Sequence, residues 1–187
     1  VPDLRLAQLA AIVKPERVLP AAVEFVDIAG LVAGASKGEG LGNQFLAHIR
    51  ETDAIAHVVR CFVNDDIVHV SGKVDPISDI DVIDTELGLA DLASVEKAVD
   101  RAAKAAKAGD KDAVRKRDLL TRLREHLNNG RPARSMQLTP EDHADLRDLH
   151  LLTLKPIMYV ANVNETGFTD NPQLNAVKTR AEKEGAV

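Results

Sequence analysis

The sequence is poor in the residues that build aromatic cores and covalent cross-links. Its 187 residues include no tryptophan, and aromatic side chains make up only 3% of the chain. Any core must therefore be aliphatic. The single cysteine, Cys61, lies in an apolar stretch and excludes an intrachain disulfide framework.

The chain also lacks a run of about 18 apolar residues and a secretory signal peptide. We therefore expect a cytoplasmic protein with no membrane partner. The formal net charge of −5 argues against an indiscriminate polyanion binder, so we expect no DNA partner, although a local basic patch is compatible with it. The chain opens on Val1 rather than Met and ends just after a helix stop, which leads us to expect a piece of a longer protein.

Three short apolar segments predict buried strands, over residues 22–29, 54–62 and 155–165. A helical pattern over 41–53 separates the first two. Strand, loop, helix and strand in this order predict a βαβ unit with a parallel sheet, and hence an α/β fold. Further helices are predicted over 3–13, after an Asp3 cap, and over 171–185.

The middle of the chain differs in kind. From about Ser78 to Gly130 it is charged and rich in alanine, and its apolar residues recur at helical spacing. This pattern predicts two amphipathic helices joined at Gly109 as an antiparallel hairpin. Thr139 then offers a cap for a further helix that ends near His150.

Two polar clusters follow predicted strands, where ligands bind in open α/β sheets. Asp27 to Gly30 follows the first strand, and Asn162 to Glu165 follows the third. A carboxylate can hold the water shell of Mg²⁺, and a nearby glycine lets a phosphate approach the backbone. An Asp and a Gly leaving a strand are also ordinary turn chemistry, so the first cluster alone leaves both interpretations open. The two clusters together favour a nucleotide site.

Four long segments of the sequence are similar to segments of a known family: FVDIAGLVAGASKGEGLGNQFL, RETDAIAHVVRCF, HVSGKVDP and LTLKPIMYVANVNE. Together they resemble the YchF family of Obg-like, ribosome-binding ATPases, in the translation-factor class of P-loop NTPases. The similarity covers nearly the whole chain. It implies a Rossmann-like parallel sheet, ATP as substrate, Mg²⁺ as cofactor and the ribosome as partner.

The resemblance also implies roles for single residues. Asp27 and Gly30 would belong to the third nucleotide motif, with Asp27 at the metal, and residues 34–42 would form the mobile switch. Leu31 stands where related GTPases carry the glutamine that orients water, and leucine has no hydrogen-bonding atom for that task. The family is thought to use a histidine instead, which matches His69. The alternative for His69 is an ordinary hydrogen bond at a sheet edge.

The motif that would recognise the nucleotide base, here called the base motif, differs from the Asn-Lys-x-Asp motif that recognises guanine in GTPases. Here the matching residues are Asn162, Val163, Asn164 and Glu165. The longer acid at Glu165 and the missing lysine should spoil the bidentate contact with guanine, so adenine is the better expectation.

The predicted fold is therefore a partial P-loop NTPase core with an inserted helical arm. Residues 1–77 and 151–187 would form the nucleotide core, and residues 78–150 would form the arm. The charged surface of the arm is either a solvent-exposed face without a partner or a contact surface for ribosomal RNA or protein. The sequence contains no G-x-x-x-x-G-K-[ST] loop, and the family's C-terminal domain is not matched, so the chain alone should be inactive. Two other functions stay open: an Obg-group GTPase, and a non-enzymatic helical interaction module on an incomplete nucleotide fold.

Overall fold

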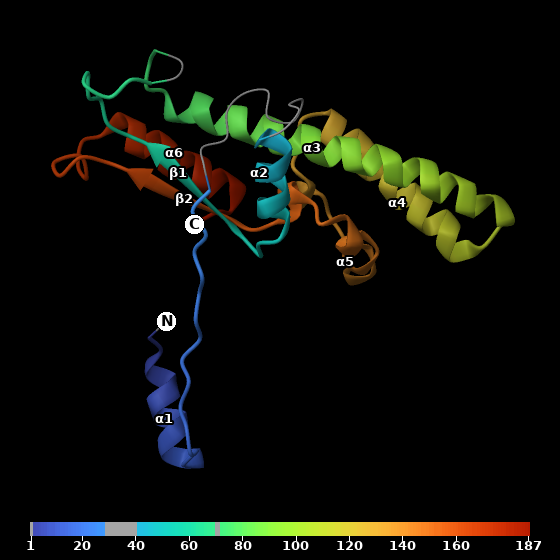
Figure 1. The fold of residues 1–187 in the computed structure, drawn as a ribbon, viewed down its shortest axis with the longest axis horizontal. Coiled ribbons are helices and arrows are strands. Elements are labelled where there is room, and N and C mark those ends of the chain that lie inside the picture. The colour runs from blue at the N-terminus through green and yellow to red at the C-terminus, as the bar shows by residue number, and fades with distance from the viewer. Residues whose placement is uncertain (1, 29–40, 70–71) are drawn as a thin grey trace.

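The computed structural model describes residues 2–28, 41–69 and 72–187. A small sheet with helices around it continues into a long helical arm, while α1 projects away at the end of an extended segment (Figure 1). The elements in chain order are α1 (Leu4–Val13), α2 (Leu41–Arg50), β1 (Ile55–Arg60), α3 (Pro76–Ala105), η1 (Ala106–Ala108), α4 (Lys111–Asn128), η2 (Ala133–Ser135), α5 (Pro140–Leu146), η3 (Arg147–Leu149), η4 (Leu152–Leu154), β2 (Ile157–Asn162) and α6 (Pro172–Glu184). Within the described ranges, no helix is long and apolar enough to cross a membrane.

The described sheet consists of β1 and β2, which run parallel with Ile55 opposite Ile157. Helix α6 packs against β2, and the beginning of α3 packs against β1. The core between them is aliphatic apart from Tyr159 and Cys61, as the composition predicts. The predicted strands over 54–62 and 155–165 are confirmed, with shorter bounds.

The predicted strand over 22–29 is wrong for the part that the structure describes. Residues 22–28 have no regular secondary structure, and Val23, Phe25 and Val26 are 61%, 75% and 59% exposed. A strand needs a neighbour for its backbone hydrogen bonds, and neither described strand pairs with this segment. The parallel pair is formed by β1 and β2 instead, with the arm between them in the sequence.

Helix α1 forms where it is predicted. The Asp3 carboxylate caps it by accepting the Arg5 N–H at 3.0 Å, and Lys14 ends it in the left-handed conformation. None of its side chains is buried, however, and Leu4 and Ile12 are 88% and 78% exposed. The periodicity therefore predicts the helix correctly but not its burial.

The arm is built by α3 and α4, which lie side by side on either side of a turn at Gly109 (Figure 1). Gly109 has a φ of 77°, which a residue with a Cβ adopts only at a cost. Asp75 and Asp110 cap the two helices through their carboxylates. The core of the arm is aliphatic and consists of Val95, Ala98, Leu119, Leu120, Leu123, Leu127, Ala133, Leu146 and Leu151.

Helix α5 begins at the Thr139 cap that the sequence predicts, and the structure forms a capping box there. The Thr139 hydroxyl accepts the Asp142 N–H at 3.1 Å, and the Asp142 carboxylate accepts the Thr139 N–H at 3.0 Å. The helix continues as η3, and His150 ends it in the left-handed conformation. The predicted end near His150 is confirmed.

A buried carboxylate, Asp91, joins α3 to the segment that leads back to the sheet. Its side chain is fully buried, and it accepts hydrogen bonds from the Leu152 N–H at 2.9 Å and from the Thr153 N–H and hydroxyl at 2.7 Å each. The Arg50 guanidinium lies 3.5 Å away. Burial raises the pKa of Asp91, and these hydrogen bonds and the Arg50 charge oppose that rise only in part.

Replacing Asp91 by alanine should therefore destabilise the fold strongly. The change leaves three buried donors and the Arg50 charge without their acceptor, and we expect a loss of about 3 kcal/mol in the free energy of unfolding. Urea denaturation of the chain measures this loss.

The matched control is Asp100→Ala, at an exposed position of the same helix. It should change the free energy of unfolding by less than about 0.5 kcal/mol. Equal stability of the two variants would contradict a central role for the Asp91 carboxylate.

Candidate functional site

The predicted base motif lies at the edge where both strands end. Asn162 closes β2 opposite Arg60 of β1, and its carbonyl accepts the Cys61 N–H at 2.7 Å. The side chains of Asn162 and Glu165 are exposed, whereas Val163 is partly buried against the apolar core of the sheet. The Asn164 side chain is exposed as well, so the motif presents three polar side chains and one apolar side chain.

Asp27 is not brought to this edge. Its side chain is exposed, and the following Ile28 packs against an apolar cluster formed by Leu46, Ile49, Leu87 and Leu152. No hydrogen bond or ion pair among the described residues joins Asp27 to the base motif or to His69. Gly30, Leu31 and most of the predicted switch lie outside the described residues.

The donor set at Asp27 is compatible with nucleotide-bound Mg²⁺. In the part of the chain that the structure describes, no group of three or more His, Cys, Asp or Glu side chains is arranged to hold a metal. Mg²⁺ bound with a nucleotide needs only one or two protein carboxylates, because water and phosphate oxygens fill its other positions. One exposed carboxylate therefore meets the chemical requirement.

His69 lies beside the first turns of α3. Its ring Nε2 is 3.0 Å from the Asp79 carboxylate, and its side chain is only 16% exposed. The His69 carbonyl accepts the Gly72 N–H at 3.0 Å. A carboxylate beside one ring nitrogen fixes the orientation of an imidazole, which suits both a structural contact and a positioned catalytic group.

Arg60 organises the loop between β1 and His69, a role that the sequence reading missed. Its guanidinium donates to the carbonyls of Phe62, Asn64 and Ile67 at 3.1 to 3.2 Å. The same group lies over the Phe62 ring, 4.7 Å from its centroid. One arginine at the end of a strand thus shapes the connection that carries His69.

A cluster of charged side chains joins α3 to α6 behind the sheet. Arg180 pairs with Asp81 at 3.0 Å and with Asp84 at 3.1 Å, and it also contacts Glu184. The Tyr159 hydroxyl of β2 donates to Glu184 at 2.9 Å. Burial, followed by the charge of Asp84 and the Glu184 contact, raises the pKa of Tyr159, so its hydroxyl stays a donor.

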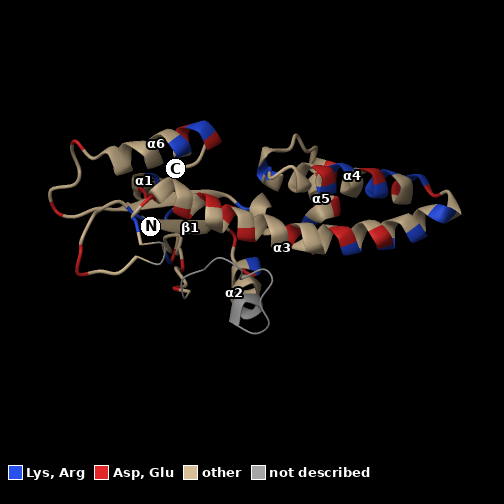
Figure 2. Ribbon diagram, turned by 90° about the horizontal axis from the view of Figure 1, so that it is seen from above, with Lys and Arg blue, Asp and Glu red and all other residues tan. Residues whose placement is uncertain are grey.

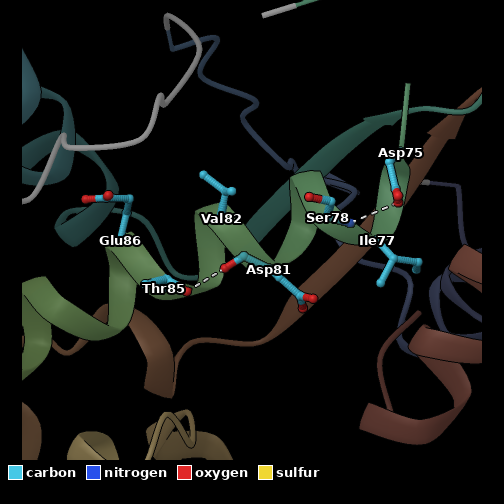
Figure 3. Close-up of a pocket in the computed structure, with 7 residues that line it drawn as sticks. All are labelled: Asp75, Ile77, Ser78, Asp81, Val82, Thr85 and Glu86. Carbon is cyan, nitrogen blue, oxygen red and sulfur yellow. Dashed lines mark hydrogen bonds between the residues drawn. The ribbon is translucent and has the colours of Figure 1, made fainter. Parts of the chain in front are cut away.

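An open groove of about 620 Å³ runs along the first half of α3. Its lining consists of Asp75, Ile77, Ser78, Asp81, Val82, Thr85 and Glu86 (Figure 3). Two of its polar groups serve the helix itself, because Asp75 caps the Ser78 N–H and the Thr85 hydroxyl donates to the Asp81 carbonyl. None of the predicted site residues lines this groove, so we do not assign the function to it.

Two further histidines, His57 and His48, lie in β1 and α2. His57 of β1 lies against Tyr159, with 5.7 Å between the ring centroids. Its Nδ1 is buried and has no hydrogen-bond partner among the described residues. Burial lowers the pKa of His57, opposed by the charges of Asp79 and Glu184. His48 is exposed in the last turn of α2.

The chain is similar to known nucleotide-binding proteins. A family model described as the 50S ribosome-binding GTPase matches residues 10–86. A protein of Haemophilus influenzae named "Ribosome-binding ATPase YchF" is 60% identical over 187 residues, which cover all of this chain and 52% of the relative. The Bacillus subtilis protein of the same name is 56% identical over 170 residues, 91% of this chain and 46% of its own length. The chain thus spans about half the length of the curated relatives it matches.

A solved structure agrees with these relatives. The YchF GTPase of Schizosaccharomyces pombe superposes with a TM-score of 0.80 at 35% identity, covering 100% of this chain and 52% of that one. This similarity and the parallel pair β1–β2 place the chain in the P-loop GTPase-like fold class.

The lowered pKa of His57 predicts a pH dependence of stability. The unfolded chain binds this proton near the ordinary value of 6.5, whereas the folded chain binds it only at lower pH. The stabilisation is therefore complete above about pH 6.5 and is lost as the pH falls through the range below it. Urea denaturation at pH 7.5 and 5.5 should show a larger acid loss for the parent than for His57→Gln.

His143→Gln is the control, because His143 is exposed in α5. It should keep the parental pH dependence. If His57→Gln loses as much stability on acidification as the parent, the buried neutral imidazole is not the cause.

Proposed function

This chain belongs to the YchF family, and on that premise we propose that the full-length protein is a Mg²⁺-dependent ATPase that associates with the ribosome in the cytoplasm. The observation that carries the proposal is the sequence Asn162-Val163-Asn164-Glu165 at the edge where two parallel strands end. Ligands bind at this edge in open α/β sheets. The reaction is hydrolysis of ATP to ADP and phosphate.

The preference for ATP follows from two side chains of the base motif. Reading guanine requires a carboxylate that accepts two hydrogens from the base edge, and Glu165 is one methylene longer than the aspartate that does so. Val163 replaces a lysine and lies partly buried against the apolar core of the sheet. A site that cannot pair with the guanine edge loses the discrimination that such hydrogen bonds supply.

The phosphate side is assigned to the segment that includes Asp27 and Gly30. The Asp27 carboxylate would hold the water shell of Mg²⁺, and the Gly30 N–H would approach a terminal phosphate. The metal supplies charge neutralisation at the transferred phosphoryl group. The support for this assignment is the D-x-x-G pattern and the compatible donor set at Asp27.

We assign His69 to the positioning of the attacking water. Leu31 cannot do so, because its side chain has no donor or acceptor, whereas an imidazole has both. The contact between His69 and Asp79 at 3.0 Å supports the assignment, since the carboxylate orients the ring.

The arm is assigned to ribosome association. Residues 1–77 and 151–187 would form the nucleotide core, with residues 78–150 inserted as an antiparallel hairpin. In support, the chain leaves the sheet after β1 and returns in the adjacent β2. The first half of α3 carries only acidic charges, whereas lysine and arginine mix with acidic residues toward the tip of α3 and along α4 (Figure 2). Some of these cations are paired, such as Arg117 with Asp118 at 2.6 Å. The unpaired cations would contact phosphates of ribosomal RNA or acidic groups of a ribosomal protein.

The first test is nucleotide competition in the full-length protein. ATP should displace a fluorescent ATP analogue at least tenfold better than GTP, a difference of about 1.4 kcal/mol. The double variant Val163→Lys/Glu165→Asp should shift the preference toward GTP. A tenfold preference of the parent for GTP would instead favour an Obg-group GTPase, and no binding of either nucleotide would favour a helical interaction module.

The second test is hydrolysis by His69→Ala in the full-length protein. Loss of a positioning or acid–base group should lower kcat by about 10²-fold with nearly unchanged ATP affinity. Single-turnover hydrolysis measures the chemical step directly.

His143→Ala is the matched histidine control and should hydrolyse ATP at the parental rate. If folded His69→Ala also keeps the parental rate, His69 only stabilises the start of α3 through Asp79.

A further inference from the structure

The side chain of Asn171, the residue before α6, makes four hydrogen bonds that join separate parts of the edge at which the base motif lies. Its Oδ1 accepts the N–H groups of Gln173 at 3.0 Å and Leu174 at 3.1 Å, which caps the helix. Its Nδ2 donates to the carbonyl of Cys61 at 2.9 Å and to that of Gly167 at 3.1 Å. Capping explains only the first two, because a cap needs an acceptor alone.

The two Nδ2 contacts close a circuit of hydrogen bonds around the base motif. The Cys61 N–H donates to the Asn162 carbonyl at 2.7 Å, at the beginning of the motif. The Gly167 N–H donates to the Asn164 carbonyl at 2.9 Å, near its end. Asn171 connects Cys61 with Gly167 and so fixes both ends of the motif relative to β1.

Gly167 shows how closely this turn is packed. A Cβ at Gly167 would lie 2.5 Å from the Asn164 Oδ1, 3.2 Å from the Val163 Cβ and 3.3 Å from the Asn164 carbonyl oxygen. The backbone at Gly167 is therefore pressed against the motif itself. The Gly167 backbone therefore has little room to shift toward Asn164 and Val163.

We propose that Asn171 is a positioning residue for base recognition, acting through the Cys61 and Gly167 carbonyls on residues 162–165. The proposal rests on the function assigned to that motif. A recognition group has to be held within about 0.5 Å of its working geometry, and hydrogen bonds from a neighbouring element provide that restraint. Asn171 contacts the motif's supports and not the nucleotide.

Two substitutions separate this bridge from the helix cap. Asn171→Asp keeps an acceptor for Gln173 and Leu174 but places carboxylate oxygens against the Cys61 and Gly167 carbonyls. Asn171→Ser also keeps a capping oxygen but carries no amide donor. Both variants therefore preserve the start of α6 and remove the bridge.

The experiment measures binding of three probes to the full-length protein: ATP, GTP and inorganic tripolyphosphate. Both Asn171 variants should weaken ATP binding about tenfold and reduce the discrimination between ATP and GTP by a similar factor, because the base contacts lose their geometry. Tripolyphosphate carries no base, so its affinity should stay within about twofold of the parent. The control Asp110→Ser changes the cap of α4 in the arm and should alter none of the three affinities.

Two results would overturn the proposal: folded variants that bind all three probes like the parent, or equal weakening of ATP and tripolyphosphate, which marks a general structural defect. If Asn171→Asp does not fold, Asn171→Ser decides. If the parent protein prefers GTP, the proposed ATP preference is wrong. The positioning role is still supported in that case if Asn171→Ser loses the preference for GTP.

Discussion

The carboxylate of Asp91 determines where the arm rejoins the sheet. A buried charge is costly unless it is paired and hydrogen-bonded. Here the donors come from residues 152 and 153, and the charge of the Arg50 guanidinium lies 3.5 Å away. The Arg50 guanidinium also donates to the His150 carbonyl at 2.9 Å, and the Lys155 ammonium donates to the Arg50 carbonyl at 3.1 Å. The end of α2, the middle of α3 and the approach to β2 are thereby fixed at one point.

A second junction fixes the other side of the sheet. Arg180 of α6 faces Asp81 and Asp84 of α3, and Glu184 receives the Tyr159 hydroxyl of β2. Burial raises the pKa of Asp84, partly offset by the charge of Arg134 and Arg180. Burial also opposes the ionised form of Glu184, but its contacts with Tyr159 and the arginines outweigh that effect and lower its pKa. The long helix α3 therefore contributes both to the arm and to the support of β2.

Local signals predict the helices and strands well, because caps, glycines and apolar periodicity act within a few residues. Asp3, Gly109 and Thr139 end or begin elements where the sequence predicts. The strand over 22–29 fails, because strand formation depends on a distant partner that no local pattern supplies. The burial of Asp91 can be predicted in part from the sequence. Asp91 lies four residues after Leu87 and four before Val95, which places it on the buried face of the helix.

The residues that support the site are harder to predict, because their partners lie far away in the sequence. The sequence predicts only a helix cap at Asn171, before Pro172. In the structure its side-chain amide also donates a hydrogen bond to the carbonyl of Cys61, 110 residues earlier. Closing so long a loop costs only slightly more entropy than closing a short one, because the cost grows with the logarithm of length. The arm can therefore intervene between β1 and β2 provided that its return is fixed, and Asp91 fixes it at the point where the chain re-enters the sheet. The geometry of residues 162–165 thus depends on a polar contact outside the motif, at the start of α6, whereas Asp91 fixes the segment that leads into β2.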